Sequence, residues 1–218
     1  MRAVALLSGG LDSVVSTALA AQEGEVALAL TCDYGQRSAA AEIRAAARVC
    51  EALGVPHEVV ELPWLGRLTA APLVDQAAAL PQPGSDALDD PEQAADLARA
   101  LWVPNRNGVL VSIGAAYAEA RACDTVVCGF NAEEGQTFPD NTPEFAQAAS
   151  EALAYSTLAG VRVWSPTQDL TKAEIVALGR RIGAPLAHVW SCYEPGPDPC
   201  GKCESCRRLR RAMTAGHG

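Results

Sequence analysis

Short apolar runs alternate with helical patterns along most of this chain of 218 residues. The apolar runs cover residues 3–7, 26–31, 57–62, 125–129 and 161–166, and a helical pattern follows each of them. Strands that alternate with helices are typical of crossover units, which build a parallel sheet covered by helices on both faces. The sequence therefore predicts an α/β fold with a doubly wound, mainly parallel sheet of five strands.

A glycine-containing loop, S-G-G-L-D-S from Ser8 to Ser13, joins the first apolar run to the first helical pattern. Glycine permits positive φ and close approach, and backbone N–H groups at a helix start bind anions. The loop lacks the lysine of the G-x-x-x-x-G-K-[ST] phosphate loop and the spacing of the dinucleotide fingerprint. We predict a phosphate site of another type, the simpler alternative being that Asp12 or Ser13 only caps the helix.

The connection from residue 63 to residue 104 is rich in proline and acidic residues and interrupts the alternation. Connections this long inside a compact domain are usually functional, so we predict a lid or a binding loop with a short helix over residues 92–101. The pattern divides the chain into a main domain, residues 1–188, and a C-terminal tail, residues 189–218.

Four of the eight cysteines lie together in this tail, at Cys192, Cys200, Cys203 and Cys206. Four closely spaced thiolates with two C-x-x-C spacings are typical of a closed tetrahedral zinc site. Such a site has no open position for water, so we assign it a structural role. An iron–sulfur cluster and a redox pair remain alternatives at this stage.

The formal net charge of −9 at pH 7 argues against a broad basic surface for nucleic acid. The basic run Arg207–Arg211 beside the cysteines could belong to a zinc-dependent nucleic-acid module. Its shortness and the acidic balance instead favour a solvated helix face. No apolar segment reaches the length of a membrane span or of a secretory signal. We therefore expect a cytoplasmic protein without membrane or nucleic-acid partners.

Further motifs extend over nearly the whole chain, from Val4 to Arg207. They include D-Y-G-Q-R at 33–37, V-P-N-R-N at 103–107, N-A-E-E at 131–134, L-T-K-A-E-I at 170–175 and W-S-C-Y-E at 190–194. Together with S-G-G-L-D-S and the cysteine-rich ending, they resemble the N-type ATP pyrophosphatases. Within that superfamily they are most similar to the 7-cyano-7-deazaguanine synthase family. The resemblance implies an adenine nucleotide alpha hydrolase-like fold with a small zinc-binding extension.

The resemblance also implies an activity in queuosine biosynthesis. Such an enzyme is a ligase that converts 7-carboxy-7-deazaguanine and ammonia to the nitrile 7-cyano-7-deazaguanine (preQ0). ATP is cleaved to AMP and pyrophosphate, with adenylated intermediates and an amide on the way. The implied cofactors are ATP, Mg²⁺ and one structural Zn²⁺ per chain, and the implied assembly is a homodimer. No glutaminase segment is recognised, so free ammonia is the expected nitrogen donor.

Site residues follow from the matching motifs. Asp12, Lys172 and Arg106 are the expected catalytic residues, with Asp12 also a candidate Mg²⁺ ligand and Arg106 a partner for the substrate carboxylate. Asp140 or Glu144 would accept hydrogen bonds from the guanine-like edge. The end of the second strand, residues 31–33, is expected near the adenine. The expected ATP-binding residues are Leu7, Ser8, Gly9, Gly10, Leu11, Asp12, Ser13, Val14, Val15, Ser16 and Thr17.

Several of these roles have plainer alternatives. Thr171 and Glu174 match a capping box, so Lys172 could simply occupy an exposed first helical turn. Glu144 or Asp140 could be a helix N-terminal charge near Pro143.

The segment Gln136–Phe145 departs from the family pattern, because Asn141 and Thr142 replace a cysteine and an arginine there. A related enzyme acting on another carboxylate therefore stays open. So do a tRNA-thiolating enzyme that adenylates a base and a non-catalytic nucleic-acid binder.

Overall fold

The computed structural model describes residues 1–84, 88 and 90–215, and its centre is a five-stranded sheet. The strands are β1 (Arg2–Leu6), β2 (Glu25–Asp33), β3 (His57–Glu61), β4 (Thr125–Val127) and β5 (Arg162–Trp164). All neighbouring pairs are parallel, in the order β3-β2-β1-β4-β5. The predicted α/β fold is confirmed. The predicted strand ends differ from the observed ones by up to two residues: β2 continues to Asp33, whereas β4 and β5 end two residues before the predicted ends.

The order of the strands reverses at β1. The chain passes from β1 to β2 on one side, and later enters β4 on the other side of β1, where Val4 pairs with Val126. Loops that leave neighbouring strands in opposite directions open a crevice at the carboxyl edge of a sheet. The Ser8–Ser13 loop lies at this switch point.

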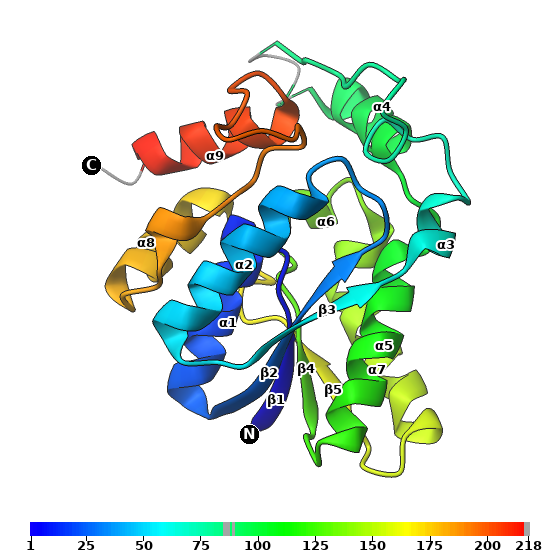
Figure 1. Cartoon of the computed structure of the whole chain (residues 1–218), viewed down its shortest axis with the longest axis vertical. Coiled ribbons are helices and arrows are strands. Elements are labelled where there is room, and N and C mark those ends of the chain that lie inside the picture. The colour runs from blue at the N-terminus through cyan, green and yellow to red at the C-terminus, as the bar shows by residue number, and fades with distance from the viewer. Residues whose placement is uncertain (85–87, 89, 216–218) are drawn as a thin grey trace.

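Helices cover both faces of the sheet (Figure 1). On one face α5 (Arg106–Ala120) and α7 (Pro143–Ser156) pack against a cluster that includes Val4, Leu30 and Val126. On the other face lie α1 (Leu11–Glu23) and α2 (Ala39–Leu53). The helix α8 (Lys172–Arg181) packs outside α1. As a result α1 is buried between the sheet and other helices, which fixes its N-terminus rigidly.

Gly129, which lies two residues after β4, allows α1 to approach the sheet closely. A Cβ added at Gly129 would lie 2.5 Å from the backbone nitrogen of Ser13 and 2.8 Å from the carbonyl carbon of Asp12. No side chain fits at that separation without moving the first turn of α1. Gly129 thus sets the distance between β4 and the loop that follows β1.

The remaining elements lie towards the carboxyl edge of the sheet. In Figure 1, α4 (Pro91–Leu101) and α9 (Glu204–Ala215) stand beyond the strand ends, above α6 (Ala132–Gly135). The predicted helix over residues 92–101 corresponds to α4. The described residues also contain the short elements α3 (Pro63–Gly66), η2 (Pro139–Asn141) and η3 (Leu186–His188).

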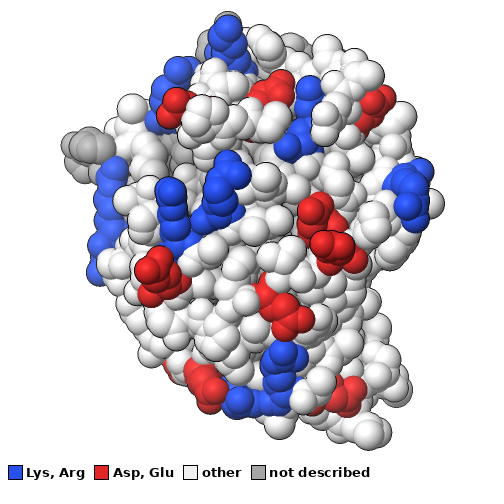
Figure 2. Space-filling model, in the orientation of Figure 1, with Lys and Arg blue, Asp and Glu red and all other residues white. Residues whose placement is uncertain are grey.

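Charges of both signs are interspersed on the face drawn in Figure 2. Lysine and arginine side chains lie among aspartate and glutamate side chains there. Of the helices in the described residues, none combines the length and the apolar character that crossing a bilayer requires.

Candidate active site

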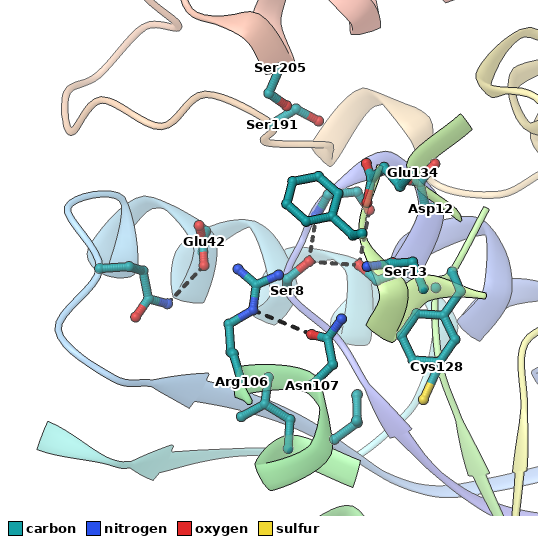
Figure 3. A pocket seen from close by; sticks show the side chains of 18 of the residues that line it. Ser8, Asp12, Ser13, Glu42, Arg106, Asn107, Cys128, Glu134, Ser191 and Ser205 are labelled. Atoms are coloured by element: carbon teal, nitrogen blue, oxygen red, sulfur yellow. Dashed lines mark hydrogen bonds between the residues drawn. The ribbon is translucent and has the colours of Figure 1, made fainter. Parts of the chain in front are cut away.

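A cleft of about 270 Å³ opens at the strand-order switch. Its floor is formed by the loops after β1 and β4, and one side by the first turn of α5. Opposite the Ser8–Ser13 loop, the tail contributes Ser191 and Ser205, which face Ser8 and Asp12 across the cleft in Figure 3. Residues of the main domain and residues of the tail, which the sequence pattern separates, therefore line the same cleft.

The Ser8–Ser13 loop has the geometry of an anion site. The Ser8 and Ser13 hydroxyls lie 3.1 Å apart, and the Ser13 hydroxyl donates to the Gly10 carbonyl at 3.0 Å (Figure 3). The N-cap residue of α1 is Gly10, and no side chain caps this helix. Its first N–H groups are therefore available to a ligand, and the dipole of α1 favours a negative charge there. Neither Asp12 nor Ser13 caps the helix with its side chain, so the alternative of simple capping is wrong.

Gly9 supports this loop from behind. It has a φ of +80°, and a Cβ there would lie 2.9 Å from the Ala45 Cβ and 3.0 Å from the Glu42 carbonyl oxygen. The backbone N–H of Trp190 donates to the Gly9 carbonyl at 2.8 Å. The absence of a side chain lets the loop fit between α2 and the tail.

Lys172 reaches the same loop from α8. Its ammonium donates to Asp12 Oδ2 at 2.8 Å and to Glu134 Oε1 at 2.7 Å, and the residue is only 8% exposed. Burial lowers the pKa of Lys172, but Asp12 and Glu134 outweigh it, so that the pKa lies above the usual value. The capping box of Thr171 and Glu174 is also present. Lys172 does lie in a first helical turn, as the alternative required, yet it is buried and points into the site.

The carboxylate of Asp12 has one oxygen to spare. Its Oδ1 is buried and has no hydrogen-bond partner, whereas Oδ2 accepts from Lys172. Burial raises the pKa of Asp12, and the charge of Lys172 acts against that rise. A buried, unpartnered carboxylate oxygen next to an anion site fits a hard cation such as Mg²⁺, which binds oxygen ligands and substrate phosphates.

The other predicted ATP-loop residues fall into two groups. Those in contact with the cleft are Leu7, Ser8, Gly10, Leu11, Asp12 and Ser13. Val14, Val15, Ser16 and Thr17 are buried inside α1 and are not among the lining residues. Thr17 Oγ1 donates to the Ser13 carbonyl at 2.7 Å, and the Ser16 hydroxyl lies 2.9 Å from that of Thr167. These four residues support the loop from within the helix.

Arg106 lies on the first turn of α5 and lines the cleft. Its guanidinium donates to the Tyr34 hydroxyl at 3.4 Å and to Asn107 Oδ1 at 3.3 Å. Figure 3 shows it directed towards the space between Glu42 and Ser8. Within the described part of the chain Arg106 forms no ion pair with a carboxylate, so its charge is available to an anionic ligand.

The two acids proposed for the guanine-like edge lie in different environments. Asp140 is 8% exposed and lines the cleft, while Glu144 is exposed in the first turn of α7 and does not. Burial raises the pKa of Asp140, and the charge of Arg106 lowers it. The placement of Glu144 agrees with a helix N-terminal charge.

The two departures from the family pattern have local roles. The Asn141 amide donates to Asp140 Oδ1 at 3.1 Å, and the Thr142 hydroxyl accepts from the Phe145 N–H at the start of α7. Asn141 therefore helps to orient Asp140, and Thr142 caps a helix.

The cysteine tail forms a compact thiol cluster. The Sγ atoms of Cys192, Cys200, Cys203 and Cys206 all lie within 4.8 Å of one another. A tetrahedral zinc with Zn–S bonds of about 2.3 Å separates its sulfurs by about 3.8 Å, so the four residues fit one such ion. Ligands bound to separate irons of a cluster lie farther apart.

Backbone N–H groups also favour thiolates in this cluster. Cys192 Sγ accepts from the Glu194 N–H at 3.3 Å and from the Cys200 N–H at 3.2 Å. Burial acts to raise the pKa of Cys200, but the N–H groups of Cys203 and Lys202 lower it to about 7. A metal that binds thiolates is the ligand such a cluster suits.

Comparison with known proteins agrees with this geometry. The family model described as "Queuosine biosynthesis protein QueC" matches residues 2–216. The chain belongs to the QueC family. The 7-cyano-7-deazaguanine synthase of Desulforudis audaxviator is 53% identical over 218 residues, which covers 100% of this chain and 99% of that protein. The enzyme of the same name from Methanosarcina mazei is 45% identical over 216 residues, covering 98% of this chain and 94% of the relative.

A QueC-family fold brings residues to the cleft that sequence reasoning did not single out. Arg208 was expected on a solvated helix face, and this is wrong: it lines the cleft and is held by Glu204 at 2.7 Å and Glu133 at 3.5 Å. The i,i+4 spacing of Glu204 and Arg208 was the available signal. Glu134 belongs to the N-A-E-E motif, but the motif alone did not indicate that this residue forms an ion pair with Lys172.

Arg37 is a second residue whose role appears only in three dimensions. Its guanidinium donates to the carbonyls of Pro72 and Ala78 at 3.3 and 2.8 Å, and lies 3.6 Å from the Glu194 carboxylate. These contacts connect the long segment after β3 to the cysteine tail. Arg37 therefore holds together two parts of the chain that border the cleft.

Proposed function

We propose that this chain converts 7-carboxy-7-deazaguanine and ammonia to 7-cyano-7-deazaguanine, with cleavage of ATP to AMP and pyrophosphate. The observation that carries the proposal is that the Ser8–Ser13 loop, the Lys172–Asp12 ion pair and Arg106 line one cleft. Among the described residues, no carboxylate forms an ion pair with Arg106. The relatives called 7-cyano-7-deazaguanine synthase cover almost the whole chain, which supports the same activity.

The reaction needs ATP because a carboxylate is a poor electrophile. Its oxygen attacks the α-phosphorus of ATP, pyrophosphate leaves, and an acyl-adenylate forms. Ammonia then attacks the acyl carbon, AMP leaves, and a proton is released to give the amide. The amide oxygen then attacks the α-phosphorus of a second ATP, pyrophosphate leaves, and one N–H proton is released. Cleavage of the C–O bond expels AMP, and release of the second N–H proton gives the nitrile. In each half the enzyme positions the groups and stabilises developing negative charge.

The phosphate half of the cleft has three components in this proposal. The first N–H groups of α1 with Ser8 and Ser13 bind the phosphates that leave as pyrophosphate. Lys172 neutralises charge that develops on the departing group. Mg²⁺, when bound, supplies further neutralisation of the phosphates, and Asp12 is the residue that would hold it.

The substrate half uses Arg106 and Asp140. Arg106 would bind the substrate carboxylate through paired N–H donors and keep it oriented for attack on ATP. Asp140 would accept from the two adjacent N–H donors of the guanine-like edge. Asp140 lines the cleft, and Arg106 forms no ion pair with a carboxylate of the described residues, so both side chains have capacity for a polar ligand.

The tail has a structural role in this scheme. Zinc bound by the four thiolates would hold residues 189–208 in place as one wall of the cleft, without contact with the reacting atoms. The division into a main domain at 1–188 and this tail is part of the proposal, as is assembly into a homodimer. Free ammonia is the proposed nitrogen donor.

A direct experiment combines zinc-replete protein with magnesium ATP, ammonium and 7-carboxy-7-deazaguanine. Mass spectrometry follows the nitrile, and nucleotide analysis separates AMP from ADP. We expect the nitrile together with AMP. AMP without the nitrile would retain the ATP chemistry and assign another substrate, either a different carboxylate or a tRNA base. ADP as the product, or no turnover beside an active control enzyme, would contradict the proposal.

A further inference from the structure

Two aromatic side chains in the cleft have no role in the proposed chemistry. The rings of Trp102 and Phe138 are nearly parallel, with an interplanar angle of 12° and centroids 6.2 Å apart. Both residues line the cleft. Trp102 directly follows α4 in the long segment after β3, and Phe138 directly precedes η2. Two segments distant in the sequence thus contribute a stacked aromatic pair to the lining of one cleft.

These rings line the same cleft as the two polar groups of the substrate half, Arg106 and Asp140. Trp102 is four residues before Arg106, and Phe138 is two residues before Asp140. The Asn107 amide donates to the Asp140 carbonyl at 3.1 Å, which fixes the first turn of α5 against η2. The cation, the carboxylate and the aromatic pair are therefore parts of one connected wall.

We infer that Trp102 and Phe138 form the apolar wall against which the deazaguanine ring packs, and that Trp102 is a specificity-determining residue. The inference rests on the proposed function and extends it to recognition of the ring itself. A planar heterocycle gains stacking and apolar burial on such a surface. Its carboxylate at one end then matches Arg106, and its two N–H donors at the other end match Asp140.

The same wall suits adenine less well. The pairing edge of adenine carries one donor and one acceptor, so its acceptor nitrogen would face the Asp140 carboxylate. Adenine also has no anionic group for Arg106. The surface expected for the nucleotide base is the lining near Cys32 and Gln36, after the end of β2, which adjoins Arg106 through the hydrogen bond of that residue to the Tyr34 hydroxyl. The composition of the wall therefore favours the acid over ATP as its ligand.

Substitution of Trp102 tests the inference. In Trp102→Ala, we expect the KM for 7-carboxy-7-deazaguanine to rise about tenfold or more, as for loss of a base-stacking partner, while the KM for ATP stays within about twofold. Trp102→Phe, which keeps an aromatic face, should restore most of the affinity. Trp64→Ala is the matched control, since Trp64 lies in the same long segment, is 43% exposed and is not a lining residue.

Isothermal titration of the acid without ATP gives the same comparison independently of turnover. Phe138→Leu keeps most of the side-chain volume and repeats the test from the second ring should Trp102→Ala fail to fold. An unchanged affinity for the acid in both variants would overturn the inference, and so would a rise in the KM for ATP instead. If the wild-type protein makes nitrile in either case, the proposed function survives. If it neither binds nor converts the acid, both fail.

Discussion

The two walls of the cleft are held in place by different means. The phosphate wall, with the Ser8–Ser13 loop and Lys172, stands on β1, α1 and α8, whose apolar side chains belong to the main core. The tail wall, residues 189–208, contains no strand. It is attached through the Trp190 N–H to Gly9, through the ion pairs Arg37–Glu194 and Arg208–Glu133, and through the packing of α9 on α8, while the thiol cluster links parts of the tail to one another.

This difference indicates which parts of the reaction need rigid support. Groups that stabilise developing charge act best when they are fixed before the reaction begins, and helices and strands fix them better than loops. A wall without strands, whose internal shape depends on the thiol cluster, opens at a lower free-energy cost than the core unfolds. We therefore expect substitutions in the phosphate wall to reduce chemistry in a folded protein, and those in the tail wall to release the tail first.

The largest effect is expected for Lys172→Ala. Loss of this ammonium should lower kcat about 1,000-fold, because it removes charge stabilisation in a water-poor site and leaves Asp12 and Glu134 close together. The rate of AMP formation measures the effect. Lys202→Ala is the control, since Lys202 is exposed in the tail. A decrease of less than tenfold would contradict a catalytic role.

Removal of a zinc ligand should release the tail wall alone. In Cys192→Ser we expect the bound zinc to fall from one per chain towards zero, and turnover to fall about 100-fold because the wall is displaced. Metal analysis and far-UV circular dichroism measure both changes. Cys50→Ala, at a buried position on α2, should keep its zinc. Global unfolding on loss of the ligand would show that the two walls are not independent.

Gly129→Ala should strain the phosphate wall from below. The added Cβ would overlap the first turn of α1, so we expect a loss of about 1–3 kcal/mol in the free energy of unfolding and weaker ATP binding. Chemical denaturation and ATP titration are the measurements. The control is Gly84→Ala, where a Cβ meets no atom within 4 Å. Wild-type ATP affinity in Gly129→Ala would contradict the proposed placement of the phosphates.

The smallest effect is expected for Arg37→Gln. The change removes the ion pair with Glu194 and hydrogen bonds to Pro72 and Ala78, at a cost of about 1 kcal/mol in local stability. Hydrogen exchange should become faster at residues 72–78 and 189–194 and stay unchanged in the strands. Arg48→Gln, an exposed position on α2, should leave both segments unchanged. Faster exchange throughout the sheet would indicate that Arg37 supports the core instead.

Most of the fold and part of the candidate site could be predicted from the sequence. The S-G-G-L-D-S loop is one continuous segment, and the four tail cysteines all lie between residues 192 and 206. Each group is therefore close in the sequence, and its spacing already indicates a chemistry. Arg208 illustrates the limit. A helical pattern shows that an arginine lies on a helix, but it does not show whether that face meets solvent or a cleft.

By itself, the sequence determined the parallel sheet, the glycine-containing loop after the first strand and the thiol cluster, because each is encoded in periodicity or in short-range spacing. Only the tertiary structure decided that Lys172 meets Asp12 and that Trp102 lies beside Phe138. Such pairs come from segments far apart in the chain. Whether two such residues meet depends on how the helices pack across the sheet. Local patterns in the sequence do not specify the distance between residues of different helices.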